Sequence, residues 1–424
     1  MQSEGIWTEI FGPSLSSTLN DSQVQAILSC LRHTHCDHKA TVQLIWGPPG
    51  TGKTKTVSML LVNLLQMKCR TLICAPTNVA IKELASRVVK LVKESVERDS
   101  RDLPFFPLGE ILLFGNNERL KVDSGVEEIY LDYRIERLVE CFAPHTSWKH
   151  YFGSMIDFLE HCVSQYHNFW DKWMKPSEDI NGNMIEQKEC WKEAEASKGE
   201  MPFHEFVRER FQRTAAPLRS CILNFGTHIP KCYIGEDNFQ VMVTLMNLLD
   251  SFETLLFQDD VVSEELEVLF SHSVDEDFSQ SILDIKYLLH KKRSECHFVL
   301  RNLRNSFNKL DLPRSKDKER LKDLVKGFCF KTASLFFSTA SSSYMLHSMA
   351  MEPLVFLVID EAAQLKESES TIPLQLSGIK HAVLFGDECQ LPAMVESKVC
   401  YCYLDILHTF SFVSFAFHPC LIEF

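Results

Sequence analysis

The stretch WGPPGTGKTKT, residues 46–56, decides the fold. In this stretch glycines let backbone N–H groups turn toward a β-phosphate, while Lys53 can bridge the β- and γ-phosphates and the Thr54 hydroxyl can ligate magnesium. The spacing G-x-x-x-x-G-K-T is filled by Gly47, Pro48, Pro49, Gly50, Thr51, Gly52, Lys53 and Thr54. We therefore expect a nucleotide-phosphate site here rather than a simple glycine-rich turn.

The residues around this loop alternate between short apolar runs and amphipathic stretches. Runs rich in β-branched or aromatic residues predict buried strands, and an apolar period of about 3.6 residues predicts helices. We expect helices over 21–31 and 54–67, and strands over 41–46, 71–75, 332–340, 353–362 and 381–387. Strands that alternate with helices predict a parallel α/β sheet that binds ligands at the carboxyl ends of its strands.

The middle of the chain lacks this alternation and carries helical periods instead, so we expect a long, mostly helical insertion in the sheet domain. The predicted division is 1–94 for the first part of the nucleotide-binding sheet domain, 95–330 for the insertion, 331–399 for the second part of that domain and 400–424 for a C-terminal tail of different composition.

Charge is polarised along the predicted insertion. Residues 232–285 contain thirteen acidic and no Lys or Arg residues, whereas 286–331 contain fourteen Lys or Arg and five acidic residues. We favour an interpretation in which the acidic and the basic segment form two solvated faces that attract each other within one helical domain. The alternative places the basic segment beside a nucleic-acid backbone, with Lys291, Lys292, Arg293, Arg301 and Arg304 as contacts.

The composition limits the class of protein. With 424 residues, 45% of them hydrophobic, and a net charge of −13, the chain is globular and has no overall attraction for nucleic acid. Fifteen cysteines without a repeated C-x-x-C indicate reduced thiols, and hence the nucleus or cytoplasm. The apolar C-terminal stretch, residues 406–424, is too interrupted for a membrane span, and we expect no membrane association.

A pair of carboxylates follows the predicted strand in VFLVIDEAAQ, residues 355–364. Beside a phosphate-binding loop, Asp360 would hold magnesium, and Glu361 would position and deprotonate the attacking water. An aspartate followed by a glutamate therefore predicts ATP hydrolysis rather than binding alone.

Six motifs in this order resemble those of superfamily 1 helicases, in the branch that includes senataxin and the up-frameshift RNA helicase. They are LNDSQVQAIL (19–28), GPPGTGKTKT (47–56), CAPTNVAIKEL (74–84), FFSTASSS (336–343), VIDEAAQ (358–364) and GDECQLPA (386–393). The resemblance implies a RecA-like P-loop NTPase domain with ATP and Mg²⁺ as cofactors, whose long insertion corresponds in position to the prong of the family.

The resemblance also assigns roles to single residues. Gln23 resembles the family's adenine-contacting glutamine, whose amide can satisfy both a donor and an acceptor on the adenine edge. Gln390 resembles the glutamine that senses the γ-phosphate, in a loop shaped by Gly386 and Asp387. Single-stranded RNA or DNA is the implied partner. Its phosphates would contact residues that resemble two further motifs: Pro76, Thr77 and Asn78, and Ser338, Thr339 and Ala340.

A zinc site is the competing hypothesis for CLRHTHCDHK, residues 30–39. Zinc prefers two ligand pairs held apart on a folded knuckle, whereas these ligands crowd the end of one predicted helix. We therefore favour a solvated loop over a site formed by Cys30, His33, His35, Cys36 and His38.

The sequence departs from the family pattern after Val399. No residues that resemble the second sheet domain follow it, nor the arginines which that domain contributes to the transition state. The expected function is the ATP-binding domain of an ATP-dependent helicase. The alternative is a catalytically incomplete fragment that binds ATP and nucleic acid, with protein partners on the helical insertion.

Overall fold

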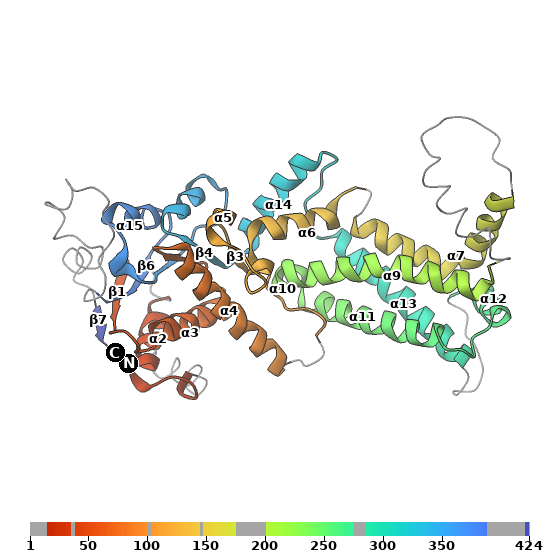
Figure 1. Cartoon of the computed structure of the whole chain (residues 1–424), viewed down its shortest axis with the longest axis horizontal. Helices are drawn as coiled ribbons and strands as arrows, with labels where there is room; N and C mark the ends of the chain where they lie inside the picture. The colour runs from red at the N-terminus through yellow and green to blue at the C-terminus, as the bar shows by residue number, and fades with distance from the viewer. Residues whose placement is uncertain are drawn as a thin grey trace. The chain divides into compact units, whose positions relative to one another are not determined.

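The computed structural model describes residues 15–34, 39–99, 103–144, 147–174, 201–274, 285–387 and 420–423 (Figure 1). In chain order its helices and strands are α2 (Asp21–His33), β1 (Thr41–Trp46), α3 (Lys53–Gln66), β2 (Thr71–Ala75), α4 (Asn78–Asp99), β3 (Ile111–Leu113), α5 (Asn117–Leu120), η1 (Glu127–Ile129), α6 (Leu131–Phe142), α7 (Trp148–Met174), α9 (Phe203–His228), α10 (Lys231–Ile234), α11 (Glu236–Leu256), α12 (Ser263–Ser271), α13 (Ile285–Asn308), α14 (Lys318–Thr332), β4 (Leu335–Thr339), η2 (Ser341–Ser348), β5 (Phe356–Ile359), η3 (Ala362–Gln364), α15 (Glu367–Leu374), β6 (His381–Gly386) and β7 (Cys420–Glu423).

Seven strands form one sheet in the order β3-β4-β2-β5-β6-β1-β7, and every pairing in it is parallel. The carboxyl ends of parallel strands lie at the same edge of a sheet. Only β6 separates β1 from β5, so the loops that follow these two strands begin about 10 Å apart. The predicted parallel α/β sheet is confirmed.

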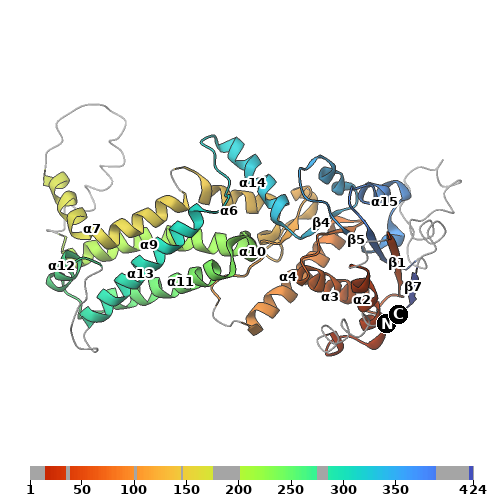
Figure 2. The ribbon, with the colours of Figure 1, turned by 180° about the vertical axis from the view of Figure 1, so that it is seen from behind.

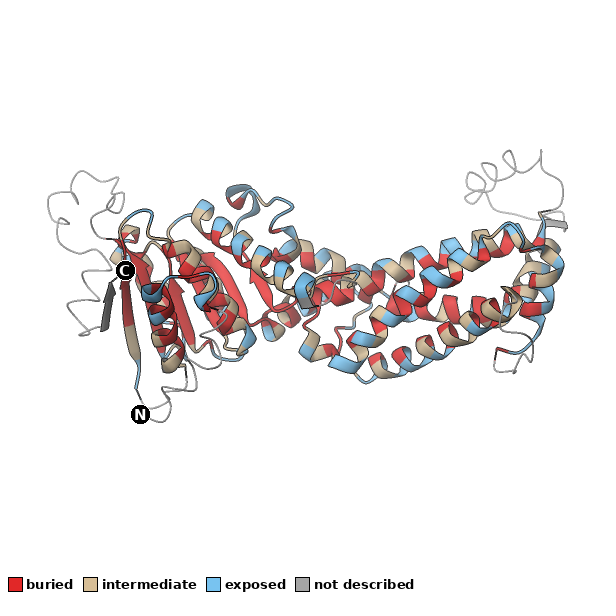
Figure 3. Cartoon of the chain, turned by 90° about the horizontal axis from the view of Figure 1, so that it is seen from below, coloured by how far each residue is buried: buried red, intermediate tan, exposed pale blue. Residues whose placement is uncertain are grey.

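Alternate residues of the strands fill the core on each side of the sheet. Ile45, Ile73, Phe337, Val358 and Phe385 belong to one hydrophobic cluster with side chains of α2, α3 and α4. These three helices therefore cover the same face, and β2 to β6 are buried along their whole length (Figure 3). Both faces need apolar side chains, which explains why the strands are continuous hydrophobic runs in the sequence.

The sheet contains two strands that the sequence pattern did not predict, β3 and, at one edge, β7. β3 is only three residues long and pairs with β4, through Ile111 opposite Leu335. Three residues are too few to display the alternation that identifies a strand. The predicted strand over 332–340 is also shorter than expected, because α14 extends to Thr332.

The described chain divides into two compact units. One unit holds the sheet and comprises 1–139, 226–233 and 313–424, and the other comprises 140–225 and 234–312. Most of α9 together with α7, α11, α12 and α13 makes up the second unit, in which the long helices run side by side (Figure 2). The expectation of a long, mostly helical insertion is confirmed, while residues 103–139 and 313–330 belong to the unit that contains the sheet.

None of the helices in the described ranges combines the length and the apolar character that a bilayer-spanning segment needs. The apolar stretch 406–424, for which we expect no membrane span, lies outside the described residues apart from the backbone of β7.

Two glycines inside helices of the sheet unit predict opposite effects of the same substitution. A Cβ atom at Gly226 would lie 2.1 Å from Cε2 of the buried Phe105 ring, whereas one at Gly327 would meet no atom within 4 Å. We expect Gly226→Ala to destabilise the fold by about 1–3 kcal/mol. Gly327→Ala should stabilise it by up to about 1 kcal/mol, because alanine restricts the unfolded chain.

Urea unfolding of the two variants and the parent chain measures both effects. An equal free energy of unfolding for Gly226→Ala and the parent chain would contradict the close contact with Phe105.

Candidate nucleotide site

The loop between β1 and α3 turns tightly and leads directly into the amino end of α3. Gly50 and Gly52 adopt left-handed conformations, with φ of 83° and 85°, and Gly52 is the N-cap of α3. Residues with a Cβ atom rarely adopt such angles, so the glycines permit the tight turn. The backbone N–H groups at the start of a helix carry partial positive charge, which suits an anion.

Lys53 is buried in the first turn of α3, and its ammonium group points back over the loop. Its Nζ atom donates to the carbonyl oxygens of Gly47 at 2.5 Å and of Pro48 at 3.4 Å. These contacts hold a positive charge above the loop, where the predicted phosphates would lie.

Gln23 connects the helix before the sheet to this loop. Its side chain and that of Asn20 form a reciprocal cap at the start of α2, with N···O distances of 2.9 and 3.1 Å. The Gln23 Nε2 atom also donates to the Thr51 carbonyl oxygen at 2.9 Å. A Cβ atom at Gly52 would lie 2.7 Å from this Nε2 atom, so the glycine leaves room for the Gln23 side chain. A side-chain amide has two donor hydrogens on its nitrogen and two acceptor positions on its oxygen. The contacts with Asn20 and Thr51 use one of each, so one N–H hydrogen and one acceptor position of Gln23 are left for adenine.

Asn20 and Lys55 are residues that the motif-based prediction did not select. Asn20 caps α2 and fixes Gln23, and the ammonium group of Lys55 donates to the carbonyl oxygen of Thr18. A capping box, with Asn followed three residues later by Gln, is a signal that the sequence does contain.

Asp360 and Glu361 follow β5 directly. Asp360 is only 4% exposed, its backbone N–H donates to the Cys74 carbonyl oxygen at 2.9 Å, and one carboxylate oxygen accepts from the Glu361 N–H at 3.1 Å. Glu361 has φ of 51° and ψ of 42°, a left-handed conformation that costs a residue with a side chain about 1 kcal/mol. Strain of this kind clusters at functional sites.

The electrostatic environment of Asp360 disfavours its charged form. Burial, together with the neighbouring carboxylate of Glu361 and that of Glu83, raises the pKa of Asp360 to about 7. The Glu361 N–H and the positive charge of Lys53 act in the opposite direction but are weaker.

The donor set at this position fits magnesium. Mg²⁺ prefers oxygen ligands, with one or two carboxylates alongside phosphates and water. The hydroxyl of Thr54, in the first turn of α3, and the carboxylate of Asp360 are oxygen donors on elements separated by β6. A buried carboxyl group whose ionisation is opposed by its surroundings gains from a nearby cation.

The end of β6 lies between these two elements. Gly386 is opposite Trp46 in the sheet, and Asp387, which follows it, is buried. The predicted γ-phosphate sensor Gln390 lies outside the described residues.

The residues predicted to contact nucleic acid follow two neighbouring strands. Thr77 is exposed and its hydroxyl accepts from the Ala80 N–H at 3.2 Å, so it caps α4 between Pro76 and Asn78. Thr339 ends β4 and is hydrogen-bonded through its hydroxyl to the next turn. Ser338, in contrast, is fully buried opposite Cys74, so its hydroxyl does not reach the surface in this conformation.

The zinc hypothesis finds no support among the described residues. The Cys30 side chain lies in the hydrophobic core with α3, and no group of three potential metal ligands occurs in the described part of the chain. The side chains of His33, His35, Cys36 and His38 lie outside it.

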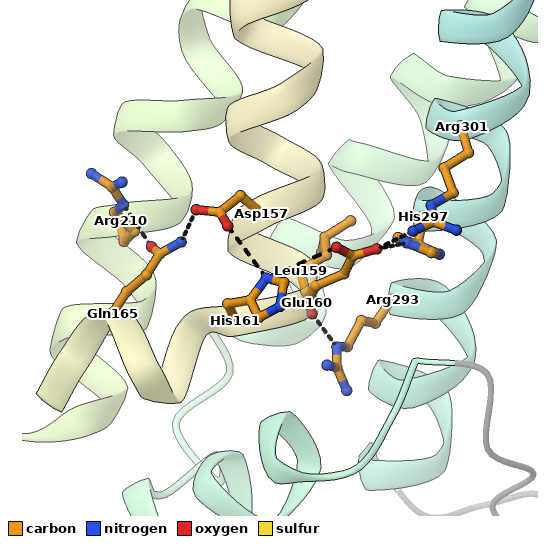
Figure 4. A network of polar contacts seen from close by, with 9 residues as sticks. All are labelled: Asp157, Leu159, Glu160, His161, Gln165, Arg210, Arg293, His297 and Arg301. Atoms are coloured by element: carbon orange, nitrogen blue, oxygen red, sulfur yellow. Dashed lines mark hydrogen bonds and ion pairs between the residues drawn. The ribbon is translucent and has the colours of Figure 1, made fainter. Parts of the chain in front are cut away.

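Several basic side chains of α13 pair with carboxylates of the same unit, although no ion pair is found for Lys291 or Arg304 within the described residues. Arg301 lies 2.7 Å and His297 lies 2.6 Å from the same carboxylate oxygen of Glu160 on α7 (Figure 4). Burial alone would raise the pKa of Glu160, but the hydrogen bond with His297 and the charge of Arg301 lower it. Lys292 pairs likewise with Glu295 at 2.8 Å.

Arg293 is buried completely, and its guanidinium donates to three backbone carbonyl oxygens. These are Leu159 at 2.8 Å, Leu269 at 2.7 Å and His272 at 3.1 Å (Figure 4 shows the first). Desolvation lowers the pKa of Arg293 to about 10, and the carbonyls at the end of α12 supply partial negative charge in return. The hypothesis that Arg293 contacts a nucleic-acid backbone is therefore wrong. The ion pair of Lys286 with Glu265, at 2.8 Å, joins the basic and the acidic segments, whereas Arg301 and Lys292 pair with carboxylates outside the acidic segment.

Comparisons with known proteins give matches to one family. The AAA domain family matches residues 18–398. The chain is 31% identical to regulator of nonsense transcripts 1 of Caenorhabditis elegans over 134 residues, which are 28% of this chain and 12% of that protein. It is 29% identical to the probable helicase senataxin of Homo sapiens over 157 residues, 33% of this chain and 6% of that protein.

A third relative is the ATP-dependent helicase NAM7 of Saccharomyces cerevisiae, which is 39% identical over 87 residues, 19% of this chain and 8% of that protein. The matches thus span about a tenth of the length of these relatives.

The raised pKa of Asp360 predicts a dependence of stability on pH. In the folded state the pKa is about 7, above the unfolded value of 3.8, so the folded state binds the proton more tightly. The contribution of this carboxyl group to stability is fully present below pH 3.8 and is lost as the pH rises through 7. Without magnesium and nucleotide, Asp360→Asn should therefore stabilise the chain at pH 8, by about 2 kcal/mol more than at pH 5.5.

Thermal unfolding of both proteins in a chelating buffer at the two pH values measures this difference. Asp323→Asn, an exposed change on α14, is the matched control and should shift neither melting temperature. If the difference in melting temperature between Asp360→Asn and the parent chain were the same at both pH values, the raised pKa of Asp360 would be refuted.

Proposed function

We propose a motor function for this chain, which belongs to the AAA domain family and, within it, to the superfamily 1 helicases related to senataxin and regulator of nonsense transcripts 1. In this proposal the chain contains the ATP-binding domain of an ATP-dependent helicase. The observation that carries it is the arrangement of β1, β6 and β5, which brings Lys53 of the glycine loop and the carboxylates of Asp360 and Glu361 to one edge of the sheet.

The glycine loop and Lys53 would bind the triphosphate. The backbone N–H groups between Gly50 and Thr54 would contact the β-phosphate, and Lys53 would exchange its contacts with the carbonyls of Gly47 and Pro48 for phosphate oxygens. The donor is ionised in both sets of contacts, but phosphate oxygens carry negative charge as well, so these hydrogen bonds join two opposite charges.

Thr54 and Asp360 would hold Mg²⁺, which neutralises charge on the β- and γ-phosphates when bound. Glu361 would orient the attacking water and accept its proton. Its carboxylate already accepts from the Gln364 side chain at 3.2 Å, a contact that fixes its orientation. The strained backbone of Glu361 supports a role in the reaction rather than in packing.

Gln23 would recognise adenine with the positions of its amide that the loop and the cap leave for a ligand. Gln390 would respond to the γ-phosphate. Pro76, Thr77, Asn78 and Thr339 would contact the phosphates of single-stranded RNA or DNA, and Ser338 would contribute through its backbone.

The helical unit is proposed as a surface for protein partners rather than for nucleic acid, because its basic side chains Arg219, Lys286 and Arg301 pair with carboxylates. Reduced cysteines and the family support a location in the nucleus or cytoplasm.

Two substitutions test the proposal with an ATPase assay in the presence of single-stranded nucleic acid. Lys53→Ala should abolish ATP binding, because the loop loses its buried positive charge. Glu361→Gln should retain ATP binding but lower the turnover at least about 100-fold, because an amide cannot accept the proton. Glu369→Gln, in the first turn of α15, is the matched control and should keep the activity of the parent chain.

The assay also separates the two candidate functions. ATP binding without turnover by the parent chain, with or without nucleic acid, would favour the alternative of an ATP- and nucleic-acid-binding module. Absence of ATP binding in calorimetry would contradict both.

A further inference from the structure

Two large apolar side chains lie exposed at the edge of the sheet where the proposed phosphate contacts lie. Val79, in the first turn of α4, is 71% exposed, and Tyr344, on η2, is 67% exposed. In the described residues of the sheet unit, Leu324 on α14 is the other large apolar side chain with comparable exposure, at 41%. Exposed apolar side chains that gather beside polar ones are typical of binding surfaces.

The pairing of β2 with β4 brings the segments that carry these side chains together. Ala75 is opposite Thr339 in the sheet, and the Ala340 N–H donates to the Ala75 carbonyl oxygen at 3.2 Å. The chain then runs from Ala75 to Val79 on one side and from Thr339 to Tyr344 on the other. Val79 and Tyr344 therefore lie in the first turns of the chain that follow the carboxyl ends of two adjacent strands.

The structure holds Tyr344 on a rigid base. Its neighbour Ser343 is buried and donates to the Ala340 carbonyl oxygen at 2.6 Å, and Leu346 is buried on the same short helix. Thr339 and Ser342 are joined by a hydrogen bond of 2.9 Å between their hydroxyls. A ring presented by an ordered segment loses little conformational entropy when a ligand stacks on it.

We propose that Tyr344, together with Val79 after the adjacent strand, is a stacking platform for a base of the single-stranded nucleic acid. This inference rests on the proposed function and extends it from the phosphates to the bases. Every base has an aromatic face, so stacking on a tyrosine ring adds affinity without sequence specificity.

The neighbouring groups favour nucleic acid over a protein partner. The exposed hydroxyl of Thr77 and the amino end of the long helix α4 lie at these strand ends, and such groups suit phosphate oxygens. An aromatic ring beside phosphate-binding groups is the combination found in sequence-independent single-strand binding.

The test is the affinity of the full chain for a fluorescent adenine oligonucleotide of about 12 residues, measured by anisotropy. Tyr344→Ala should weaken binding about tenfold, Val79→Ala less than that, and Tyr344→Phe should leave it unchanged because the ring remains. Leu324→Ala is the matched control, since α14 leads into the opposite end of β4, and should bind as the parent chain does.

An oligonucleotide of the same length without bases identifies the contact. The parent chain should bind it about tenfold more weakly than the adenine oligonucleotide, whereas Tyr344→Ala should not distinguish the two. Equal affinities of Tyr344→Ala and the parent chain for the adenine oligonucleotide would overturn the inference while leaving the proposed function intact. Failure of the parent chain to bind either oligonucleotide, with ATP bound normally, would overturn the nucleic-acid part of the proposed function and the inference with it.

Discussion

The parallel pairing of β5, β6 and β1 is the constraint on which the candidate site depends. Backbone hydrogen bonds fix the register of these strands, through Trp46 opposite Gly386 and Ile359 opposite Leu384. Since all three strands end at the same edge, side chains more than 300 positions apart in the sequence meet there. A shift of one residue in this register would turn Asp360 and its neighbours to the other face.

The site concentrates features that cost stability. Asp360 is buried where its ionised form is disfavoured, and Glu361 has a left-handed backbone. Both follow β5, whose four residues are completely buried. The apolar burial of the strand therefore offsets the cost of the polar turn that follows it. The helical unit also buries a charge, that of the Arg293 guanidinium. Backbone carbonyl groups, instead of a carboxylate, compensate this charge.

The sequence predicted the features that depend on local residue order. The glycine loop, the strand that delivers Asp360 and the helical character of the insertion all have a signal within some fifteen residues, and each is found in the structure. Features set by tertiary contacts were not predictable. The pairing of β3 with β4, the burial of Ser338 opposite Cys74 and the burial of Arg293 depend on segments far away in the sequence. A basic residue in a basic stretch gives no sign that carbonyl groups will surround it.

The order of the strands has a consequence for how the chain folds. β2 lies between β4 and β5, and Thr71 pairs with Leu335, about 260 residues later. At a synthesis rate of about 5–20 residues per second, β2 emerges from the ribosome roughly 10–50 s before either neighbour exists. During this interval its apolar residues have no sheet to join. Compaction of the helical unit shortens the loop to be closed, so biosynthetic folding of the sheet is expected to wait for the helices that interrupt it.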